Sequence, residues 1–146
     1  MRKIITICSS AAFYRHVNEI AAKLEKRGYE VRVPMTATKM LKSGNYNVAD
    51  YKTWYENSDD FGKKTSLMRG HFDEVAAADA ILVVNDEKHG AKGYIGPNGL
   101  MEMGLAFYLN KPIYVLYPVT SDMPLYEEVV GMGSIILGDK LDKITL

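Results

Sequence analysis

Short apolar runs alternate with longer segments of helical period along this chain, and this alternation constrains the fold more than any other feature. The first run, residues 4–8, is continuously apolar, as expected of a strand buried on both faces of a sheet. Residues 11–27 follow with apolar positions at helical spacing and a stop at Gly28, and residues 30–33 give a second strand pattern. Two strands joined by a helix predict a right-handed parallel β-α-β unit.

The rest of the chain repeats this alternation. Further helices and strands are predicted, in order, over 63–78, 80–84, 98–109, 112–117, 125–130 and 134–137. Regular exchange of strand and helix is typical of α/β proteins with a parallel sheet. The sequence therefore predicts one domain over residues 1–146, a doubly wound, flavodoxin- or Rossmann-like fold with a five-stranded parallel sheet and helices on both faces.

Residues 35–61 interrupt the pattern. They are polar and rich in tyrosine, and asparagines, a glycine and adjacent aspartates break any regular period. A segment of this length inside a compact domain is usually a lid or binding segment with short helices of its own. Tyr51, Trp54 and Tyr55 give it the aromatic surface to close over a ligand or to pack on a partner subunit.

Charge and composition exclude several functions. Lysine plus arginine and aspartate plus glutamate both number 18, so no net field attracts a nucleic acid polymer or an anionic membrane. No apolar run has the roughly 20 residues of a membrane span, and residues 1–3 lead directly into a strand pattern rather than a signal peptide. The expected location is cytoplasmic.

Cysteine and histidine are too sparse in the sequence to indicate a metal centre. Cys8 is the only cysteine, which excludes an internal disulfide and indicates a reducing compartment. The histidines, His16, His71 and His89, are far apart along the chain, with no second cysteine or clustered carboxylate beside them. We expect no metal and no cofactor.

The candidate site follows from the sheet topology. Ligands of open parallel sheets bind outside the carboxyl ends of the strands. The segments that leave those ends are Ser9-Ser10, 85–98 and 117–123. The second is rich in glycine, which allows the backbone to approach a ligand closely, and Asn98 is a plausible N-cap for the helix that follows.

Glu102 is the only charged residue between residues 93 and 110, in a helix that is otherwise almost wholly apolar. A buried helix rarely retains a carboxylate without a cause. Helix capping is the competing explanation, because a glutamate in the first turn meets the helix dipole and completes a capping box. Capping requires Glu102 at the third helical position, which holds if Gly99 is the cap and fails if Asn98 is. The residues alone leave both explanations open.

Three stretches resemble one known family. They are ADAILVVN at 78–85, GYIGPN at 93–98 and MEMGLA at 101–106. Together they look like the nucleoside 2-deoxyribosyltransferase family and the related nucleotide N-glycosidases, with close similarity over about half of the chain. The first strand, ending at Ser9-Ser10 with Phe13 behind it, is compatible with the first substrate loop of that family.

This resemblance implies a chemistry for Glu102. In the family, the matching glutamate is the nucleophile that attacks the anomeric carbon of the sugar, and an aspartate matching Asp79 helps to hold the base. The implied partner is a small nucleoside or nucleotide, bound without a cofactor by a homodimer or larger assembly. The candidate substrate-binding residues are Ser9, Ser10, Phe13, Asp79, Asn85, Tyr94, Gly96 and Asn98.

The sequence departs from the family at Gly96. Six residues before the nucleophile, transferases of the family commonly carry an aspartate, and the nucleotide hydrolases carry a phosphate-binding serine. The missing contact must come from Asn98, from the amides of residues 96–99, or from Ser9 and Ser10. The family also borrows an asparagine-bearing segment from a neighbouring subunit, and residues 123–132 offer no match to it.

Three functions remain open at this stage. The first is an enzyme that cleaves or transfers an N-glycosidic bond, with water or a second base as acceptor. The second is a nucleotide-binding or sensing module that retains the fold without turnover. The third, a flavodoxin-like electron carrier, is disfavoured because the loop after the first strand lacks the glycine- and hydroxyl-rich phosphate loop of such carriers.

Overall fold

A computed structural model describes residues 1–146 and confirms the predicted fold class. Five parallel strands form one sheet in the order β2-β1-β3-β4-β5, which is the flavodoxin-like order. The strands are β1 (Ile4–Ser9), β2 (Glu30–Arg32), β3 (Ala80–Val84), β4 (Ile113–Val115) and β5 (Ile135–Ile136). The helices are α1 (Tyr14–Lys26), α2 (Met35–Ser43), α3 (Phe61–Ala77), α4 (Pro97–Tyr108) and α5 (Tyr126–Gly131).

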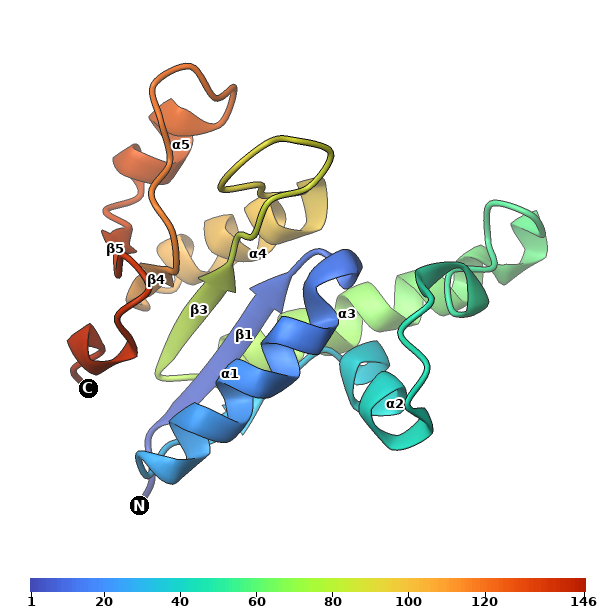
Figure 1. Ribbon diagram of the computed structural model, residues 1–146, viewed down its shortest axis with the longest axis horizontal. Coiled ribbons are helices and arrows are strands. Elements are labelled where there is room, and N and C mark those ends of the chain that lie inside the picture. Colours follow the sequence, from blue (N-terminus) through green and yellow to red (C-terminus); the bar gives the residue numbers. More distant parts are fainter.

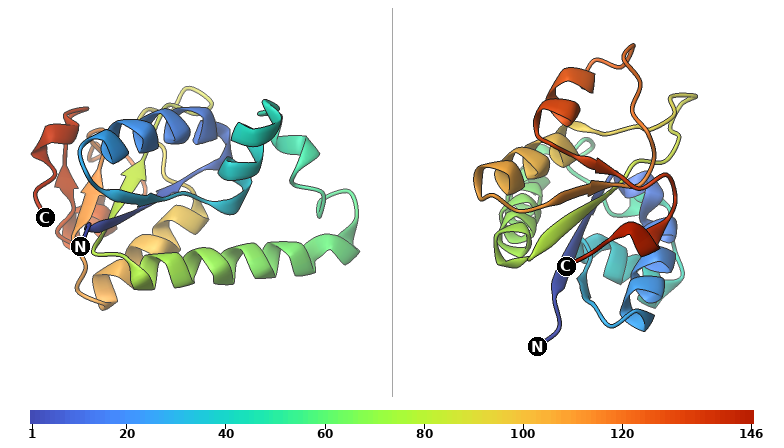
Figure 2. Two further views of the ribbon diagram at one scale, coloured as in Figure 1. Left: turned by 90° about the horizontal axis from the view of Figure 1, so that it is seen from below. Right: turned by 90° about the vertical axis from the view of Figure 1, so that its left-hand side faces the viewer.

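The two faces of the sheet carry different cores, because alternate residues of a strand point to opposite sides. Ile5 and Ile7 of β1 are fully buried in the cluster that contains the apolar stripe of α1. Cys8, also fully buried, belongs to the second cluster, with Val75 of α3 and Met103 of α4. The views in Figure 2 show α1 on one side of the sheet and α3 and α4 on the other. β1 therefore runs between the two helical layers.

The segment 35–61 has the short helices that its length predicted. It contains α2 and two single-turn 3₁₀ helices, η2 (Val48–Asp50) and η3 (Ser58–Asp60). In Figure 1 this segment and the beginning of α3 extend to one side of the sheet, beyond the tip of β1. Trp54 is 5% exposed, so the segment packs its own indole inward. None of the helices combines the length and the apolar character that a membrane crossing requires.

Strand register brings the ends of the two central strands to one place. Ser9 at the end of β1 pairs with Val84 at the end of β3. The chain continues from β1 to the outer strand β2 on one side, and from β3 to β4 on the other. The order reverses between β1 and β3, and this switch point is where ligands bind in open α/β sheets.

Candidate functional site

A cavity of about 880 Å³ opens at the carboxyl ends of β1 and β3. Its walls come from the loop after β1, from α2, from the segment before α3, and from α3 and α4. Six of the residues expected from the sequence line it: Ser9, Ser10, Tyr94, Gly96, Asn98 and Glu102. Tyr51, Trp54 and Tyr55 line it too, so the aromatic group of the 35–61 segment faces the same space.

α4 begins earlier than predicted, and this decides the capping question. Gly96 is the N-cap and Pro97 occupies the first helical position, so Glu102 lies in the second turn and no acidic residue lies in the first. A capping box requires the third position, so Glu102 cannot form one. Its side chain is only 7% exposed and accepts no hydrogen bond from the protein. Capping does not explain this carboxylate.

The surroundings of Glu102 hold it in the neutral form at low and neutral pH. Burial raises the pKa of the Glu102 carboxyl to about 8, and the positive charge of Lys64 opposes this shift only in part. Near neutral pH, a carboxyl group whose charge is disfavoured by burial ionises when an opposite charge or a bound ligand compensates for that charge. The site therefore responds to the charge of whatever enters the cavity.

His71 lies directly beside this carboxyl group. Its Nε2 atom is 3.3 Å from Oε2 of Glu102, and the imidazole is 10% exposed. Burial lowers the pKa of His71 to about 4, although the Ile7 backbone and the charge of Glu74 favour its protonated form. Both partners are neutral near pH 7, so their contact is not an ion pair. The geometry does not make it a hydrogen bond either, and Nε2 has no partner.

Two further groups are perturbed by the same carboxyl group. Burial first, and the charge of Glu102 second, raise the pKa of the Cys8 thiol. The same two causes lead the rise in the pKa of Tyr14, whose side chain lines the cavity at the start of α1. Glu102 therefore lies at the centre of a cluster of buried titratable groups, a pattern that is enriched at functional sites.

Hydroxyl groups and a lysine lie where β1 ends. Ser10 precedes η1 (Ala11–Phe13) but makes no capping hydrogen bond. Instead its Oγ accepts a hydrogen bond from Nζ of Lys88 over 3.2 Å, and that ammonium lies 5.0 Å from the centre of the Tyr94 ring. Ser9 donates to the carbonyl of Val84. Hydrogen bonds within the protein therefore hold the hydroxyl groups of Ser9 and Ser10 and the ammonium group of Lys88 in place at the cavity wall.

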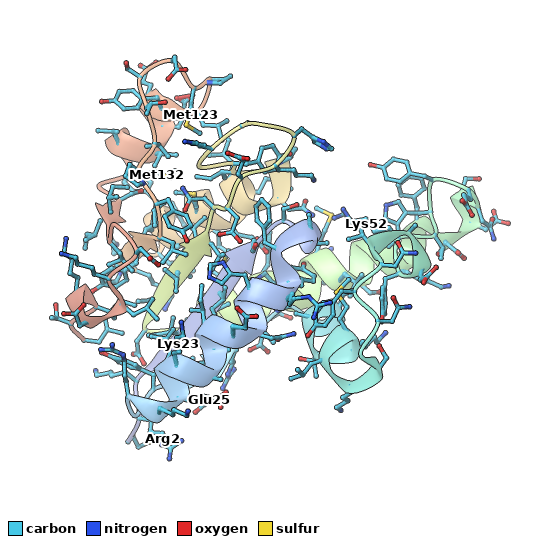
Figure 3. All side chains as sticks on the ribbon, in the orientation of Figure 1. Arg2, Lys23, Glu25, Lys52, Met123 and Met132 are labelled. Atoms are coloured by element: carbon cyan, nitrogen blue, oxygen red, sulfur yellow. The ribbon has the colours of Figure 1, made fainter.

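Positive charge gathers around the cavity although the whole chain is neutral. Lys52, Lys64 and Lys88 all line it. The pKa of Lys52 is lowered by burial and by the charges of the other two lysines, and burial also lowers the pKa of Lys64. Figure 3 shows Lys52 on the segment that leads to α3, well separated from Lys23 on α1. Mutual repulsion of these lysines favours an anionic ligand.

The first helical turn of α4 adds uncharged donors. The backbone amides of Asn98 and Gly99 have no acceptor within the protein, whereas the amide of Leu100 donates to the carbonyl of Gly96. Free amides at a helix N-terminus bind anions. They belong to residues that line the cavity.

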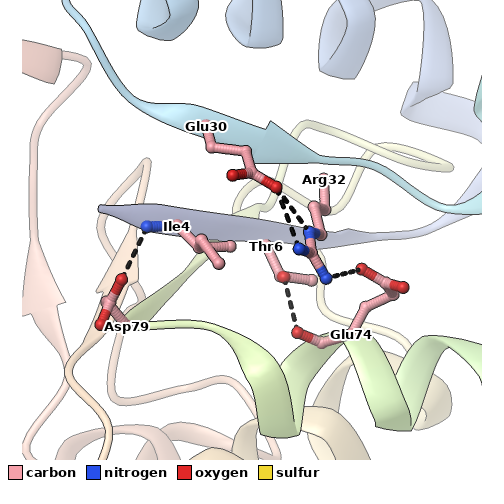
Figure 4. A network of polar contacts seen from close by, with 6 residues as sticks. All are labelled: Ile4, Thr6, Glu30, Arg32, Glu74 and Asp79. Atoms are coloured by element: carbon pink, nitrogen blue, oxygen red, sulfur yellow. Dashed lines mark hydrogen bonds and ion pairs between the residues drawn. The ribbon is translucent and has the colours of Figure 1, made fainter. Parts of the chain in front are cut away.

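The structure does not bring Asp79 to this cavity. Asp79 lies before β3, at the amino ends of the strands, where its Oδ2 accepts a hydrogen bond of 2.7 Å from the amide of Ile4 (Figure 4). The cavity is at the opposite, carboxyl ends. A base-holding role is incompatible with this position, because a strand separates the carboxylate from the ligand space. Asp79 joins the beginnings of β1 and β3.

Asn85 and Phe13 also lie outside the cavity lining. The Asn85 side chain is fully buried, donates to the carbonyl of Tyr117 over 2.9 Å and accepts from its amide over 2.8 Å. It fastens the end of β3 to the end of β4. Phe13 is a core residue whose ring meets that of Tyr94 edge-on at 6.3 Å. Both residues support the site from behind.

Gly93 has a reason other than ligand approach. Gly93 has a φ of +68°, and a Cβ there would lie 2.7 Å from the carbonyl oxygen of Pro118. Its conformation fits this loop against the segment after β4. A Cβ at Gly96 would instead meet the hydroxyl of Tyr94 at 3.4 Å, an ordinary to tight contact. Gly93 is required by packing within the protein.

Sequence reasoning missed His71, Tyr14 and the pair Lys52 and Lys64 as site residues. His71 had a usable signal, because it falls in the apolar stripe of the helix over 63–78, where a titratable side chain is unusual. The prediction that no second cysteine or clustered carboxylate lies beside a histidine is wrong at His71, because its ring lies close to Cys8 and Glu102 in space. Separations of 63 and 31 residues along the chain concealed this.

The site lies on a flavodoxin-like α/β fold, and comparison with known proteins agrees with that class. No family model and no curated protein matches the chain. Among solved structures, the chain is similar to the CMP N-glycosidase BcmB of Clostridium botulinum, with a TM-score of 0.50 and 17% sequence identity. The match covers 93% of this chain and 90% of the other. At this identity, the likeness establishes the fold.

Proposed function

We propose that this protein cleaves or transfers the N-glycosidic bond of a nucleoside 5′-monophosphate, or of the corresponding nucleoside, with Glu102 as the nucleophile. One observation carries the proposal. The carboxyl group of Glu102 does not cap its helix and accepts no hydrogen bond, and it faces a cavity at the switch point of the sheet. The resemblance of residues 93–98 and 101–106 to the deoxyribosyltransferases supports it. So does the N-glycosidase that shares the fold.

The chemistry fits what the cavity offers. A buried carboxylate opposite an oxocarbenium-like centre stabilises positive charge on the sugar and forms a covalent glycosyl intermediate. The leaving base takes the bonding electron pair of the C–N bond. Water or a second base then attacks the anomeric carbon and loses a proton, and the bond between Glu102 and the sugar breaks, which returns the carboxylate. The aromatic residues of the 35–61 segment restrict access of bulk water to that intermediate.

Lys52, Lys64 and Lys88 favour a phosphorylated substrate over a neutral nucleoside. A phosphate would meet these lysines together with the free amides of Asn98 and Gly99. Phosphate binding also removes the mutual repulsion of the ammonium groups. The repulsion between the ammonium groups in the empty cavity is therefore relieved when a phosphate binds, and this relief adds to the binding free energy.

A second candidate, a nucleotide-binding or sensing module without turnover, is favoured by the pKa of Glu102. With a pKa of about 8, only about a tenth of the carboxyl is ionised at pH 7. A neutral carboxyl group is a poor nucleophile. Turnover requires that the bound substrate or a higher pH ionises Glu102, whereas a sensor has no such requirement.

Release of free base separates the two candidates. Purified protein is incubated in EDTA with a panel of nucleosides and their 5′-monophosphates, and the products are separated by liquid chromatography. The enzyme releases base, and faster from a monophosphate. A protein that binds a monophosphate in calorimetry but releases no base at pH 7 or pH 9 contradicts the enzyme and supports the sensor. Light scattering measures the homodimer or larger assembly, which stays a prediction.

A further inference from the structure

Three side chains from three different elements converge below the floor of the cavity. They are Cys8 of β1, His71 of α3 and Glu102 of α4, and a ligand atom from each lies within 4.8 Å of the other two. α3 and α4 pack against the same face of the sheet, the face on which the Cys8 side chain is buried. The fold itself creates the cluster.

The cluster is polar, buried and unsatisfied. Nε2 of His71 is shielded from solvent and has no hydrogen-bond partner. Glu102 accepts no hydrogen bond, and its contact with that nitrogen is 3.3 Å long. A buried polar atom without a partner is destabilising, and native proteins retain few of them. An unpaired imidazole nitrogen beside a buried carboxyl group, with a buried thiol in the same 4.8 Å cluster, is an arrangement of donor atoms that fits a metal ion.

We propose that Cys8, His71 and Glu102 bind a Zn²⁺ ion. Thiolate, imidazole and carboxylate are the three ligand types of protein zinc, and a thiolate excludes the hard cations Mg²⁺ and Ca²⁺. Tetrahedral zinc bonds of about 2.0–2.3 Å place ligand atoms roughly 3.5 Å apart, so ligand atoms that now lie within 4.8 Å of one another need to approach by roughly 1 Å. On binding, the Cys8 thiol and the protonated Glu102 carboxyl group each lose a proton to solvent, and neutral His71 binds through its unprotonated nitrogen.

Charge balance and access support the same assignment. One thiolate and one carboxylate neutralise the two charges of the ion, so the occupied site carries no net charge in its buried position. His71 and Glu102 line the cavity, whereas Cys8 lies behind them. The fourth coordination position therefore faces the cavity and takes water or an oxygen of a ligand.

Zinc at this position blocks glycosidic chemistry, because the ion occupies the carboxylate that attacks the sugar. This consequence rests on the proposed function, whereas zinc binding does not. Zn²⁺ should therefore inhibit base release reversibly, and EDTA should restore it. The cluster would make turnover dependent on free zinc.

Binding is tested with Co²⁺, a spectroscopic substitute for Zn²⁺, on EDTA-treated and desalted protein. We expect one Co²⁺ per chain, tetrahedral visible bands and a thiolate charge-transfer band, all abolished by added Zn²⁺. Cys8→Ser should lose the charge-transfer band, and His71→Leu should weaken binding at least about 10-fold. The matched control His89→Leu removes an exposed loop histidine and should bind as the wild type does. Circular dichroism verifies that each variant is folded.

Two results would overturn the site: no thiolate band with wild type, or unchanged Co²⁺ affinity in His71→Leu. If Cys8→Ser or His71→Leu does not fold, Glu102→Gln decides in its place, since it retains side-chain volume while removing a ligand. Base release in EDTA is measured separately. Its absence contradicts the proposed function and leaves the cobalt result standing, while zinc binding without inhibition contradicts Glu102 as nucleophile and leaves the metal site standing.

Discussion

The two ends of the central strands place a carboxyl group in opposite environments. At the amino ends, Asp79 is exposed and accepts a backbone hydrogen bond from Ile4, so its charge joins two strands. At the carboxyl ends, Glu102 is buried without a hydrogen bond, beside an imidazole nitrogen that is also unpaired. One end satisfies its polar groups and the other leaves them free for a ligand. Unsatisfied polarity, more than acidity, distinguishes the candidate site.

The largest effect on activity is expected from the substitution of Glu102 by glutamine. Base release should fall at least about 10³-fold, corresponding to about 4 kcal/mol of activation free energy. The free energy of unfolding at pH 8 should not fall, because the substitution removes a charge that burial disfavours. Chromatographic assay and urea denaturation measure the two quantities. Glu127→Gln, on the exposed surface of α5, is the matched control. Equal base release in wild type and Glu102→Gln would reject the nucleophile.

The second largest effect is expected in the pH dependence of turnover. Glu102 must be ionised to attack, and its pKa is raised to about 8, so kcat/KM in EDTA should rise about 10-fold per pH unit below pH 8 and level off above it. A profile that is flat from pH 6 to pH 9 contradicts a buried, neutral Glu102 in the free enzyme.

Folding stability should show the reverse trend with pH. The folded-state pKa of Glu102 lies above its ordinary value of 4.5, so the folded state binds more protons between these values. The contribution of Glu102 to stability is fully present below pH 4.5 and is lost as the pH rises through about 8. Urea denaturation at pH 6 and pH 9 should show a larger loss in wild type than in Glu102→Gln. Parallel losses in both proteins would contradict the assignment.

Lys52→Met tests the positive charge of the cavity. Loss of one of three converging ammonium groups should raise KM for a monophosphate about 5- to 10-fold and leave KM for the nucleoside within about 2-fold. Steady-state kinetics with both substrates measure this difference. Lys23→Met changes an exposed lysine of α1 and is the control. An equal effect of Lys52→Met on both substrates would indicate a packing role instead.

The smallest effect on activity is expected at Asp79. Asp79→Ala should lower the free energy of unfolding by about 1 kcal/mol, because the amide of Ile4 loses its acceptor. Turnover should stay within about 2-fold of wild type, since the cavity lies at the other end of the strands. If base release falls by more than the fraction of folded protein does, Asp79 has a direct role in activity, which would contradict its placement outside the active site.

Local patterns in the sequence predicted the fold class and singled out Glu102 as the candidate nucleophile. Periodicity predicted all five strands, and the central strands β1, β3 and β4 were the clearest because strands buried on both faces read as largely apolar runs. Glu102 was conspicuous for a related reason, as one charge in an apolar helix. These features depend on residues close together in the chain, and local patterns record them directly.

The tertiary structure decided what depends on distant residues. The start of α4 at Pro97 removed the capping explanation for Glu102, and the position of Asp79 at the amino ends removed it from the cavity. The meeting of Cys8, His71 and Glu102 required three elements to pack on one face of the sheet. Spatial proximity between residues far apart in sequence is set by packing of elements, so no local pattern contains it.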